Sequence, residues 1–273
     1  MSIEITFPDG SVRPFEPGVT GLSIAEGISR GLAKKAVAVK VNGALWDLTR
    51  PIEESAKFEI VTRDTPEGLD ILRHDAAHVL AQAVQELFPG TQVTFGPTTD
   101  DGFYYDFARD TPFSTDDFDK IEKRMREIVD ADLPILRTVW KKEDAIAHFR
   151  SLGEIYKAET IDEVIKPGDP ITIYSHGDKW GDLCRGPHVP STGRIGAARV
   201  MSLASSYWHG DENSDRLIRV YGTAFFSQAE LDEFLKQKEE AAKRDHRVIG
   251  KNLRLFHIDE AVGQGLILWT PNG

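Results

Sequence analysis

The sequence lacks the features of a membrane-spanning or secreted protein. No apolar run reaches the roughly 18 residues that a membrane helix needs, and the mean hydropathy is −0.33. The N-terminal residues Met1-Ser2-Ile3-Glu4 carry neither a basic start nor an apolar block, so no secretory signal is predicted. Cysteine occurs once in 273 residues, as Cys184, which excludes a disulfide framework and favours a reducing compartment. We therefore expect a cytoplasmic protein without a membrane partner.

The sequence also lacks an excess of positive charge, an internal repeat and any low-complexity segment. It holds 33 lysines and arginines against 44 aspartates and glutamates, which gives a formal net charge of −11. Such a chain can bind nucleic acid only through a local basic patch, because its overall field is repulsive. Hydrophobic residues at 40% and aromatic residues at 9% are ordinary for a folded protein. The length allows two or three small domains, or one larger domain.

Residues 1–62 have the pattern of a small domain in which strands surround a helix. Residues 3–7 and 37–41 alternate between apolar and polar side chains, as half-buried strands do. The dipeptides Asp9-Gly10 and Asn42-Gly43 supply hairpin turns at the ends of these runs, and a helix is predicted between them. A hairpin, a helix and further strands follow each other in the order of a β-grasp (ubiquitin-like) fold. Another small α+β domain is the alternative.

The rest of the chain predicts a larger domain and a helical extension. Residues 63–226 mix helical and strand-like segments without regular alternation, which is typical of a mixed α+β domain. Thr65-Pro66-Glu67-Gly68 predicts a linker-like break at its start. Residues 227–250 open on a capping box and predict one linker helix. Residues 251–273 are too short to fold alone.

Four side chains form the constellation that could carry chemistry. His74 and His78 are four residues apart on a predicted helix, so both imidazoles lie on one face, a turn apart. Cys184 and His188 have the same spacing, but Gly186-Pro187 forbids a regular helix and places them on a loop. Three imidazoles and one thiol suit tetrahedral zinc. They suit equally a metal-free hydrolytic site in which imidazoles carry protons near neutral pH.

Each of these side chains also has a structural interpretation. A lone histidine on a helix is more often structural than catalytic, and a single free cysteine is usually a small buried hydrophobe. Two imidazoles on an otherwise apolar helix face need polar partners, however, and a second pair with the same spacing favours a functional site. The spacing does not separate zinc binding from metal-free hydrolysis, so both interpretations stay open here.

The motifs around these residues resemble a known family. Arg73-His74-Asp75-Ala76-Ala77-His78 and Asp182-Leu183-Cys184-Arg185-Gly186-Pro187-His188 resemble the editing domain of threonyl-tRNA synthetases, and the alanyl-type editing domain shares the spacings. Further stretches are similar to the threonyl enzymes in particular: residues 102–106, Tyr156-Lys157, residues 219–224 and residues 241–247. The resemblance covers the whole chain, with a TGS-type β-grasp domain at residues 1–62. Residues 251–273 look like the start of a class II catalytic domain, so the chain resembles a truncated N-terminal part of a bacterial enzyme.

This resemblance implies hydrolysis of tRNA(Thr) mischarged with serine, giving serine and free tRNA(Thr). Serine is threonine without one methyl group, and a missing methyl alters binding by only about 1–3 kcal/mol. A second site that is too tight for the methyl can therefore correct what the synthetic site accepts. The ligase reaction, with its ATP, magnesium and zinc, belongs to the missing catalytic domain. The fragment is expected to be a monomer and the full-length enzyme a homodimer.

The resemblance and the residue types together suggest individual roles. His74 is expected to position the terminal ribose or handle its proton, and Lys157 to position water or stabilise negative charge. Asp182 would hold the α-ammonium of serine, and Tyr105 would pack beside its side chain. The expected substrate-binding set is His78, Tyr105, Asp182, Cys184 and His188, and the candidate tRNA contacts are Arg73, Arg185 and Arg194.

No cofactor is expected for editing. The alanyl-type relatives use the same constellation for zinc, and the ligands here would be His74, His78, Cys184 and His188. Two rival functions therefore stand beside editing. One is a non-catalytic module that docks the tRNA acceptor arm, and the other is a zinc-dependent hydrolase.

Overall fold

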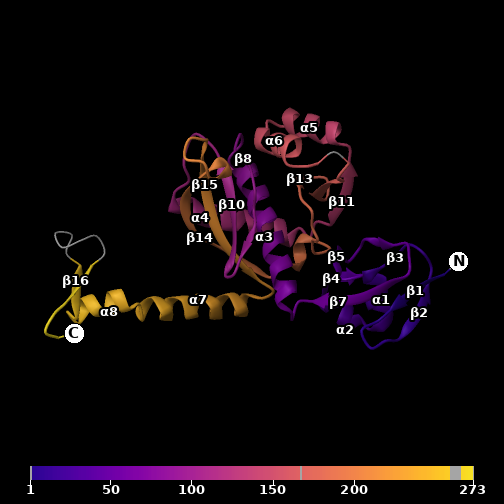
Figure 1. Ribbon diagram of the computed structural model, residues 1–273, viewed down its shortest axis with the longest axis horizontal. Helices are drawn as coiled ribbons and strands as arrows, with labels where there is room; N and C mark the ends of the chain where they lie inside the picture. Colours follow the sequence, from indigo (N-terminus) through magenta and orange to yellow (C-terminus); the bar gives the residue numbers. More distant parts are fainter. Residues whose placement is uncertain (1, 167, 259–265, 273) are drawn as a thin grey trace. The chain divides into compact units, whose positions relative to one another are not determined.

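The computed structural model describes residues 2–166, 168–258 and 266–272. It divides the chain into two compact units, Met1–Ser227 and Gln228–Gly273 (Figure 1). The first unit contains the β-grasp domain, residues 1–62, and a second domain, residues 63–226. Within the described ranges, no helix is both long and apolar enough to cross a membrane.

The β-grasp prediction for the N-terminal domain is confirmed. Its five-stranded sheet has the order β2-β1-β7-β4-β5, with β1 parallel to β7 at the centre and the other pairs antiparallel. The predicted single helix is two short helices, because Ser29 both ends the first and caps the second. The elements are β1 (Ile3–Thr6), β2 (Val12–Phe15), β3 (Val19–Thr20), α1 (Gly21–Ile28), α2 (Arg30–Lys35), β4 (Ala36–Val41), β5 (Ala44–Asp47), β6 (Pro51–Ile52) and β7 (Ala56–Thr62).

The expected linker at residues 65–68 is instead the first turn of the longest helix, α3 (Pro66–Leu87). The Thr65 hydroxyl accepts a hydrogen bond from the Gly68 amide, and Pro66 occupies the first turn, where its missing N–H costs nothing. A Cβ on Gly68 would lie 2.2 Å from the Thr62 carbonyl oxygen. The β-grasp domain therefore runs directly into α3 without a flexible spacer.

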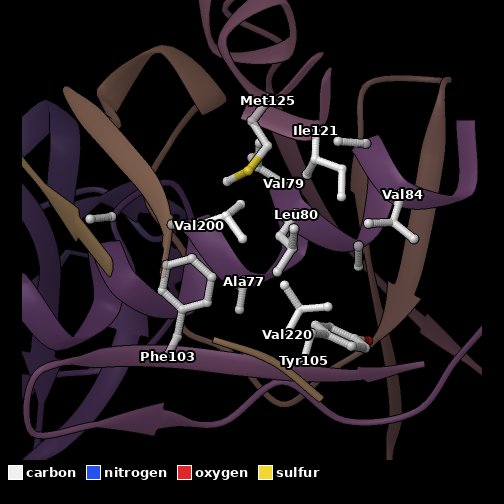
Figure 2. Packing of buried hydrophobic residues seen from close by; sticks show 14 of the residues in the cluster. Ala77, Val79, Leu80, Val84, Phe103, Tyr105, Ile121, Met125, Val200 and Val220 are labelled. Carbon is white, nitrogen blue, oxygen red and sulfur yellow. The ribbon is translucent and has the colours of Figure 1, made fainter. Parts of the chain in front are cut away.

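The second domain is built around α3. One face of the helix lies on the sheet β14-β15-β10-β8, and α4 packs beside it. Figure 2 shows Leu80, Val84, Phe103, Ile121 and Val220 meeting in this core. The elements are β8 (Gln92–Val93), β9 (Thr98–Thr99), β10 (Gly102–Ala108), η1 (Thr115–Asp117), α4 (Phe118–Asp130), η2 (Thr192–Arg194), β14 (Ala197–Tyr207), η3 (Trp208–Gly210) and β15 (Arg216–Phe225).

A second, smaller sheet completes this domain and carries Asp182 and Leu183, which begin the second motif. It has the order β11-β12-β13, all antiparallel, and two helices bury Phe149 and Ile161 against it. Its elements are β11 (Ile135–Trp140), α5 (Lys142–Ser151), α6 (Ile155–Glu163), β12 (Ile171–His176) and β13 (Trp180–Leu183). The mixed α+β fold class is thus confirmed.

The C-terminal unit contains two helices where one linker helix was expected over residues 227–250. The helices α7 (Gln228–Lys243) and α8 (His246–Asn252) are separated at Arg244-Asp245. The Asp245 carbonyl accepts the Ile249 amide, so Asp245 occupies the N-cap position of α8, where aspartate is favoured. The strands β16 (Phe256–Ile258) and β17 (Ile267–Trp269) form an antiparallel hairpin after it.

The two domains of the first unit share a small apolar core. Val37, Ala38 and Val61 of the β-grasp domain pack with Ile71, Ile135, Tyr174 and Val189 of the second domain. These residues are between 0 and 6% exposed. The β-grasp domain is therefore packed against the elements that carry the candidate site.

Candidate active site

The two histidine-bearing pairs converge as the sequence predicts. His74 and His78 lie a turn apart on α3, and the loop after β13 brings Cys184 and His188 to the same place. The Cys184 Sγ lies 3.0 Å from His74 Nε2 and 3.2 Å from His188 Nε2. The three imidazole rings have centroids 4.8 Å apart in every pair. We call these four side chains the histidine–thiol cluster.

The loop that carries Cys184 and His188 depends on Gly186. This residue has a φ of +69°, a conformation that L side chains rarely adopt. A Cβ at this position would lie 2.2 Å from the Tyr174 hydroxyl oxygen. Any larger side chain would therefore displace the loop from α3 and open the cluster.

Asp75 orients His188 within the cluster. One Asp75 oxygen lies 2.7 Å from His188 Nδ1, and the other accepts the Val189 amide at 3.0 Å. When Asp75 is ionised, this contact places the proton of a neutral imidazole on Nδ1 and leaves Nε2 to accept from the Cys184 thiol. Asp75 stands inside the motif that suggested His74 and His78, but neither spacing nor residue type marked it as their partner.

Burial keeps the histidine–thiol cluster uncharged at neutral pH. It lowers the pKa of His74 and of His188 to about 4, and it lowers the pKa of His78 well below its usual value. Burial also raises the pKa of the Cys184 thiol to about 12. Neutral imidazoles can both accept and donate a proton, whereas a protonated thiol is a poor nucleophile.

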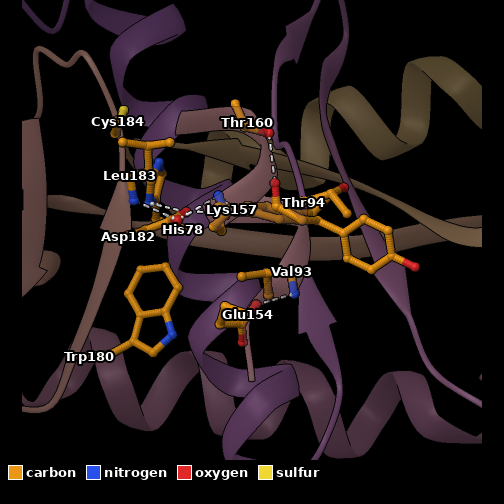
Figure 3. Close-up of polar contacts among 12 residues, drawn as sticks. His78, Val93, Thr94, Glu154, Lys157, Thr160, Trp180, Asp182, Leu183 and Cys184 are labelled. Carbon is orange, nitrogen blue, oxygen red and sulfur yellow. Dashed lines mark hydrogen bonds and ion pairs between the residues drawn. The ribbon is translucent and has the colours of Figure 1, made fainter. Parts of the chain in front are cut away.

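A buried ion pair adjoins the cluster. Lys157 on α6 and Asp182 on β13 are 2% and 1% exposed, and Lys157 Nζ lies 2.5 Å from Asp182 Oδ1. The Tyr105 hydroxyl on β10 donates to Asp182 Oδ2 at 2.6 Å and accepts from Lys157 at 3.0 Å. His78 Nδ1 lies 3.4 Å from the same carboxylate, which links this group to the histidines. Figure 3 shows His78, Lys157 and Asp182 converging from three elements.

The contacts of Asp182 bear on its expected role. Its two oxygens accept from Lys157, from Tyr105 and from the Leu183 amide, and His78 lies beside them. A carboxylate has about four acceptor positions, so an α-ammonium would have to displace one of these donors. Tyr105 is also turned toward Asp182, with its hydroxyl engaged there. In this arrangement the most direct role of Asp182 and Tyr105 is to orient Lys157.

Glu154 anchors the helix that carries Lys157, although no sequence signal pointed to it. It is 6% exposed at the start of α6 and accepts the Val93 amide of β8 at 3.0 Å. Gln85 of α3 donates to its other oxygen. These contacts fix the start of α6 against α3 and β8, and therefore the position from which Lys157 extends.

The three arginines expected to contact tRNA lie in different surroundings. Arg73 is 8% exposed, donates to the Asp100 carbonyl at 2.7 Å and lies over the Phe225 ring. This burial favours a structural role for Arg73, and its contact with tRNA stays a prediction. Arg185 is exposed next to Cys184. Arg194 lies at the junction with the β-grasp domain, where it donates to the Lys34 carbonyl.

Asp47 is a residue of the β-grasp domain that reaches the candidate site. It is 7% exposed at the end of β5. One of its oxygens accepts the His188 amide at 2.9 Å, and the other accepts the Tyr174 hydroxyl at 2.8 Å. The centroids of the Tyr174 and His188 rings lie 4.1 Å apart. Because Asp47 and His188 are 141 positions apart, only the tertiary structure could reveal this contact.

We expect Asp47→Ala to destabilise the loop of His188. The change leaves the Tyr174 hydroxyl and the His188 amide buried without their acceptor, at a cost of about 1–3 kcal/mol each. The melting temperature should fall, and amide hydrogen exchange should accelerate over residues 184–189. Asp64→Ala is the matched control, since Asp64 belongs to an exposed pair with Lys35. Unchanged exchange in the Asp47 variant would show that this contact does not hold the loop.

The histidine–thiol cluster also has the donor set of a zinc site. The potential ligand atoms of His74, His78, Cys184 and His188 all lie within 4.8 Å of one another. Three imidazole nitrogens and one sulfur suit tetrahedral zinc, and Asp75 supplies the carboxylate partner that metal-bound histidines commonly have. Zinc would require the thiol to lose its proton, which burial opposes.

Comparisons with known proteins match both domains. Residues 3–62 match the TGS domain family, and residues 171–221 match the family described as the threonyl and alanyl tRNA synthetase second additional domain. The second match includes Asp182, Cys184 and His188 but begins after His74 and Lys157 in the chain.

Full-length relatives match along nearly the whole chain. The threonine--tRNA ligase of Hyphomonas neptunium is 58% identical over 272 residues, which cover 99% of this chain and 41% of the ligase. Those of Phenylobacterium zucineum and Thiobacillus denitrificans are 55% and 53% identical, over 41% and 42% of their lengths. The chain thus spans about two fifths of the length of these curated relatives. In sequence the chain is similar to the N-terminal part of these threonine--tRNA ligases, and its match to the TGS domain family precedes its match to the additional domain of threonyl and alanyl tRNA synthetases.

Proposed function

We propose that the site hydrolyses the ester of seryl-tRNA(Thr) to serine and free tRNA(Thr), without a metal. The observation that carries the proposal is the meeting of two groups at His78 and Asp182. One is the uncharged histidine–thiol cluster, and the other is the buried ammonium of Lys157. Ester hydrolysis needs proton carriers and a positive group for the oxyanion, and these two groups supply both. The similarity to threonine--tRNA ligases supports the choice of substrate.

His74 is the proposed contact for the terminal ribose. It is the only half-buried histidine of the cluster, since His78 and His188 are 4% and 2% exposed. Its imidazole is neutral near pH 7 because burial lowers its pKa to about 4. A neutral imidazole can accept the proton of a ribose hydroxyl or return it to the leaving oxygen. His78 and His188 line the site behind it.

Lys157 is the proposed source of positive charge. Its ammonium is held by Asp182 and Tyr105, so it is oriented before the substrate arrives. An ammonium fixed in a dry site stabilises developing negative charge more strongly than the same group in water. The α-ammonium of serine is expected to compete with Lys157 for Asp182, and this exchange would turn Lys157 toward the reacting carbonyl.

Cys184 is proposed to line the site rather than to attack the ester. Its Sγ lies between the Nε2 atoms of His74 and His188. The thiol is protonated at neutral pH because burial raises its pKa to about 12. The Gly186 amide donates to the sulfur at 3.3 Å, which further ties it to the loop. A trapped serine thioester that forms and breaks at the rate of turnover would contradict this assignment.

The proposal is tested by deacylation of seryl-tRNA(Thr) and threonyl-tRNA(Thr) with this chain. We expect rapid loss of serine and slow loss of threonine. A synthetic site separates the two amino acids by only about 1–3 kcal/mol, so a useful editing site must be too tight for the methyl group of threonine. Loss of neither ester, with tRNA binding retained, would favour the acceptor-arm docking module. Equal loss of both would show a hydrolase that does not discriminate at this site.

A zinc-dependent hydrolase is the second candidate, because the four donor atoms of the cluster suit that metal. We expect deacylation to persist after dialysis against a chelator, and less than one zinc per chain to remain by elemental analysis. The physical reason is that neutral imidazoles and a protonated thiol already satisfy one another in the cluster. One tightly held zinc per chain, with activity lost on its removal and restored on its return, would establish the metal-dependent alternative.

In the whole protein, this activity would support the fidelity of threonine attachment in the cytoplasm. Ligase activity, with its ATP, magnesium and separate zinc, is proposed for the full-length enzyme and not for these 273 residues. The chain studied alone is expected to be a monomer and the full-length enzyme a homodimer. Equilibrium sedimentation of both forms would test this difference.

A further inference from the structure

A basic pocket lies where the β-grasp domain meets the second domain. Its volume is about 200 Å³, and its lining includes Lys34 and Lys35 from the first domain and Arg63 and Arg194 from the second. Val37 and Phe226 supply apolar walls, and Val189 links the pocket to the loop of His188. We call this feature the junction pocket. Neither domain alone has all of its cations.

The charge of the junction pocket is unbalanced. Among the described residues, none of the side chains that line it is acidic. Lys35 pairs with Asp64 outside the lining, whereas the structure pairs none of Lys34, Arg63 and Arg194 with a carboxylate in the part of the chain that it describes. Gathering cations without a counter-charge is unfavourable, and it stands out in a chain of net charge −11. An anionic ligand would relieve that repulsion.

Two of the cations are held in place by the fold. Arg194 is fixed by its hydrogen bond of 2.8 Å to the Lys34 carbonyl, which spans the two domains. The Arg63 guanidinium lies 5.1 Å from the centre of the Phe226 ring. Both side chains are half-buried, so less conformational freedom is lost when they bind a ligand. A guanidinium presents its N–H groups as a fork that matches the oxygens of a phosphate.

We infer that the junction pocket binds a backbone phosphate of the tRNA. This inference rests on the proposed function, because the substrate proposed above carries a phosphate at every nucleotide. An acidic chain can hold a polyanion only through local basic features, and this pocket concentrates four cations at one position. Since both domains contribute, the bound phosphate also ties the β-grasp domain to the domain that carries the histidines. This gives the β-grasp domain a part in capturing tRNA.

The test compares the binding of uncharged tRNA(Thr) by wild type and by the double variant Arg63→Ala/Arg194→Ala. We expect roughly tenfold weaker binding and a salt-dependence slope that is smaller by about 1, because a charge-assisted phosphate contact is lost. Lys123→Ala/Arg126→Ala on α4 is the matched control, since it removes two exposed cations outside the pocket. Arg63→Lys/Arg194→Lys keeps the charge and should bind tRNA with intermediate affinity.

A second readout separates this inference from the proposed function. Hydrolysis of 3′-O-seryl-adenosine, which has no backbone phosphate, reports on the hydrolytic site without the junction pocket and is measured with the wild-type protein. If no form of the protein hydrolyses this ester, the proposed function fails while the tRNA binding comparison still tests the pocket. Unchanged affinity and salt slope in the double variant would overturn the inference. The inference would also be overturned if inorganic phosphate raised the melting temperature of wild type while the double variant bound tRNA as tightly as wild type.

Discussion

The His74→Ala variant is expected to deacylate seryl-tRNA(Thr) about 10²–10⁴-fold more slowly in a single turnover, which is the usual contribution of a positioned proton carrier. Its fold should be little affected. His74 is half-buried, and its imidazole makes its hydrogen bond to a thiol, which is a weak partner. Removing it leaves no buried charge and no unpaired backbone group. The rate should therefore fall far more than the melting temperature.

The matched control for this prediction is His148→Ala. His148 lies on α5 and contacts the Trp140 and Phe149 rings, outside the histidine–thiol cluster. That variant should keep the full deacylation rate. His188→Ala would be a poorer test, because it also breaks the contact with Asp75 that holds the loop. A His74→Ala protein that deacylates at the wild-type rate would remove His74 from the mechanism.

The Lys157→Met variant is expected to deacylate seryl-tRNA(Thr) about 10²–10³-fold more slowly, as when one donor to an oxyanion is deleted. Unlike the His74 variant, it should also lose stability. Lys157 is 2% exposed and pairs with Asp182 at 2.5 Å, so its removal leaves a buried carboxylate uncompensated. Breaking such a buried pair typically costs about 3–5 kcal/mol. The rate must then be measured on protein shown to be folded.

The charge-balanced variant Lys157→Met/Asp182→Asn tests whether the stability lost with Lys157 comes from the uncompensated Asp182 carboxylate. It removes both charges, so most of the lost stability should return, while the rate stays low. Lys142→Met on α5 serves as the control, because Lys142 belongs to a half-exposed pair with Asp162 and lies outside the site. Tyr105→Phe should give a smaller loss, since the ammonium keeps its bond to Asp182. A double variant that regains both stability and rate would show that the ammonium is not used in hydrolysis.

The β-grasp domain is joined to the candidate site by three independent features. It packs through Val37, Ala38 and Val61, it sends Asp47 to the loop of His188, and it supplies two cations to the junction pocket. We therefore expect the β-grasp domain to influence hydrolysis in two separate ways, by holding the loop of His188 in position and by helping to bind tRNA. Asp47→Ala should act on loop stability, and the arginine variants on tRNA affinity. The two effects have different measurements and can be told apart.

The sequence by itself determined the fold class, the domain order and the residues of the histidine–thiol cluster. These follow from local rules. Alternation and turn dipeptides define the strands of the β-grasp domain, and a four-residue spacing puts His74 and His78 on one face of α3. The loop of Cys184 and His188 was predicted because glycine and proline interrupt a helix. The family motifs then joined the two pairs.

Only the tertiary structure decided how these residues are paired and which are accessible. Lys157, Tyr105 and Asp182 come from three elements and form one buried group, which turns Asp182 toward Lys157. Arg73 is buried whereas Arg185 is exposed, and Asp47 contacts the loop of His188 across 141 positions. Such pairings depend on which surfaces pack together, and no spacing along the chain encodes that. Burial, which also sets the pKa values of the cluster, is a property of the folded chain as a whole.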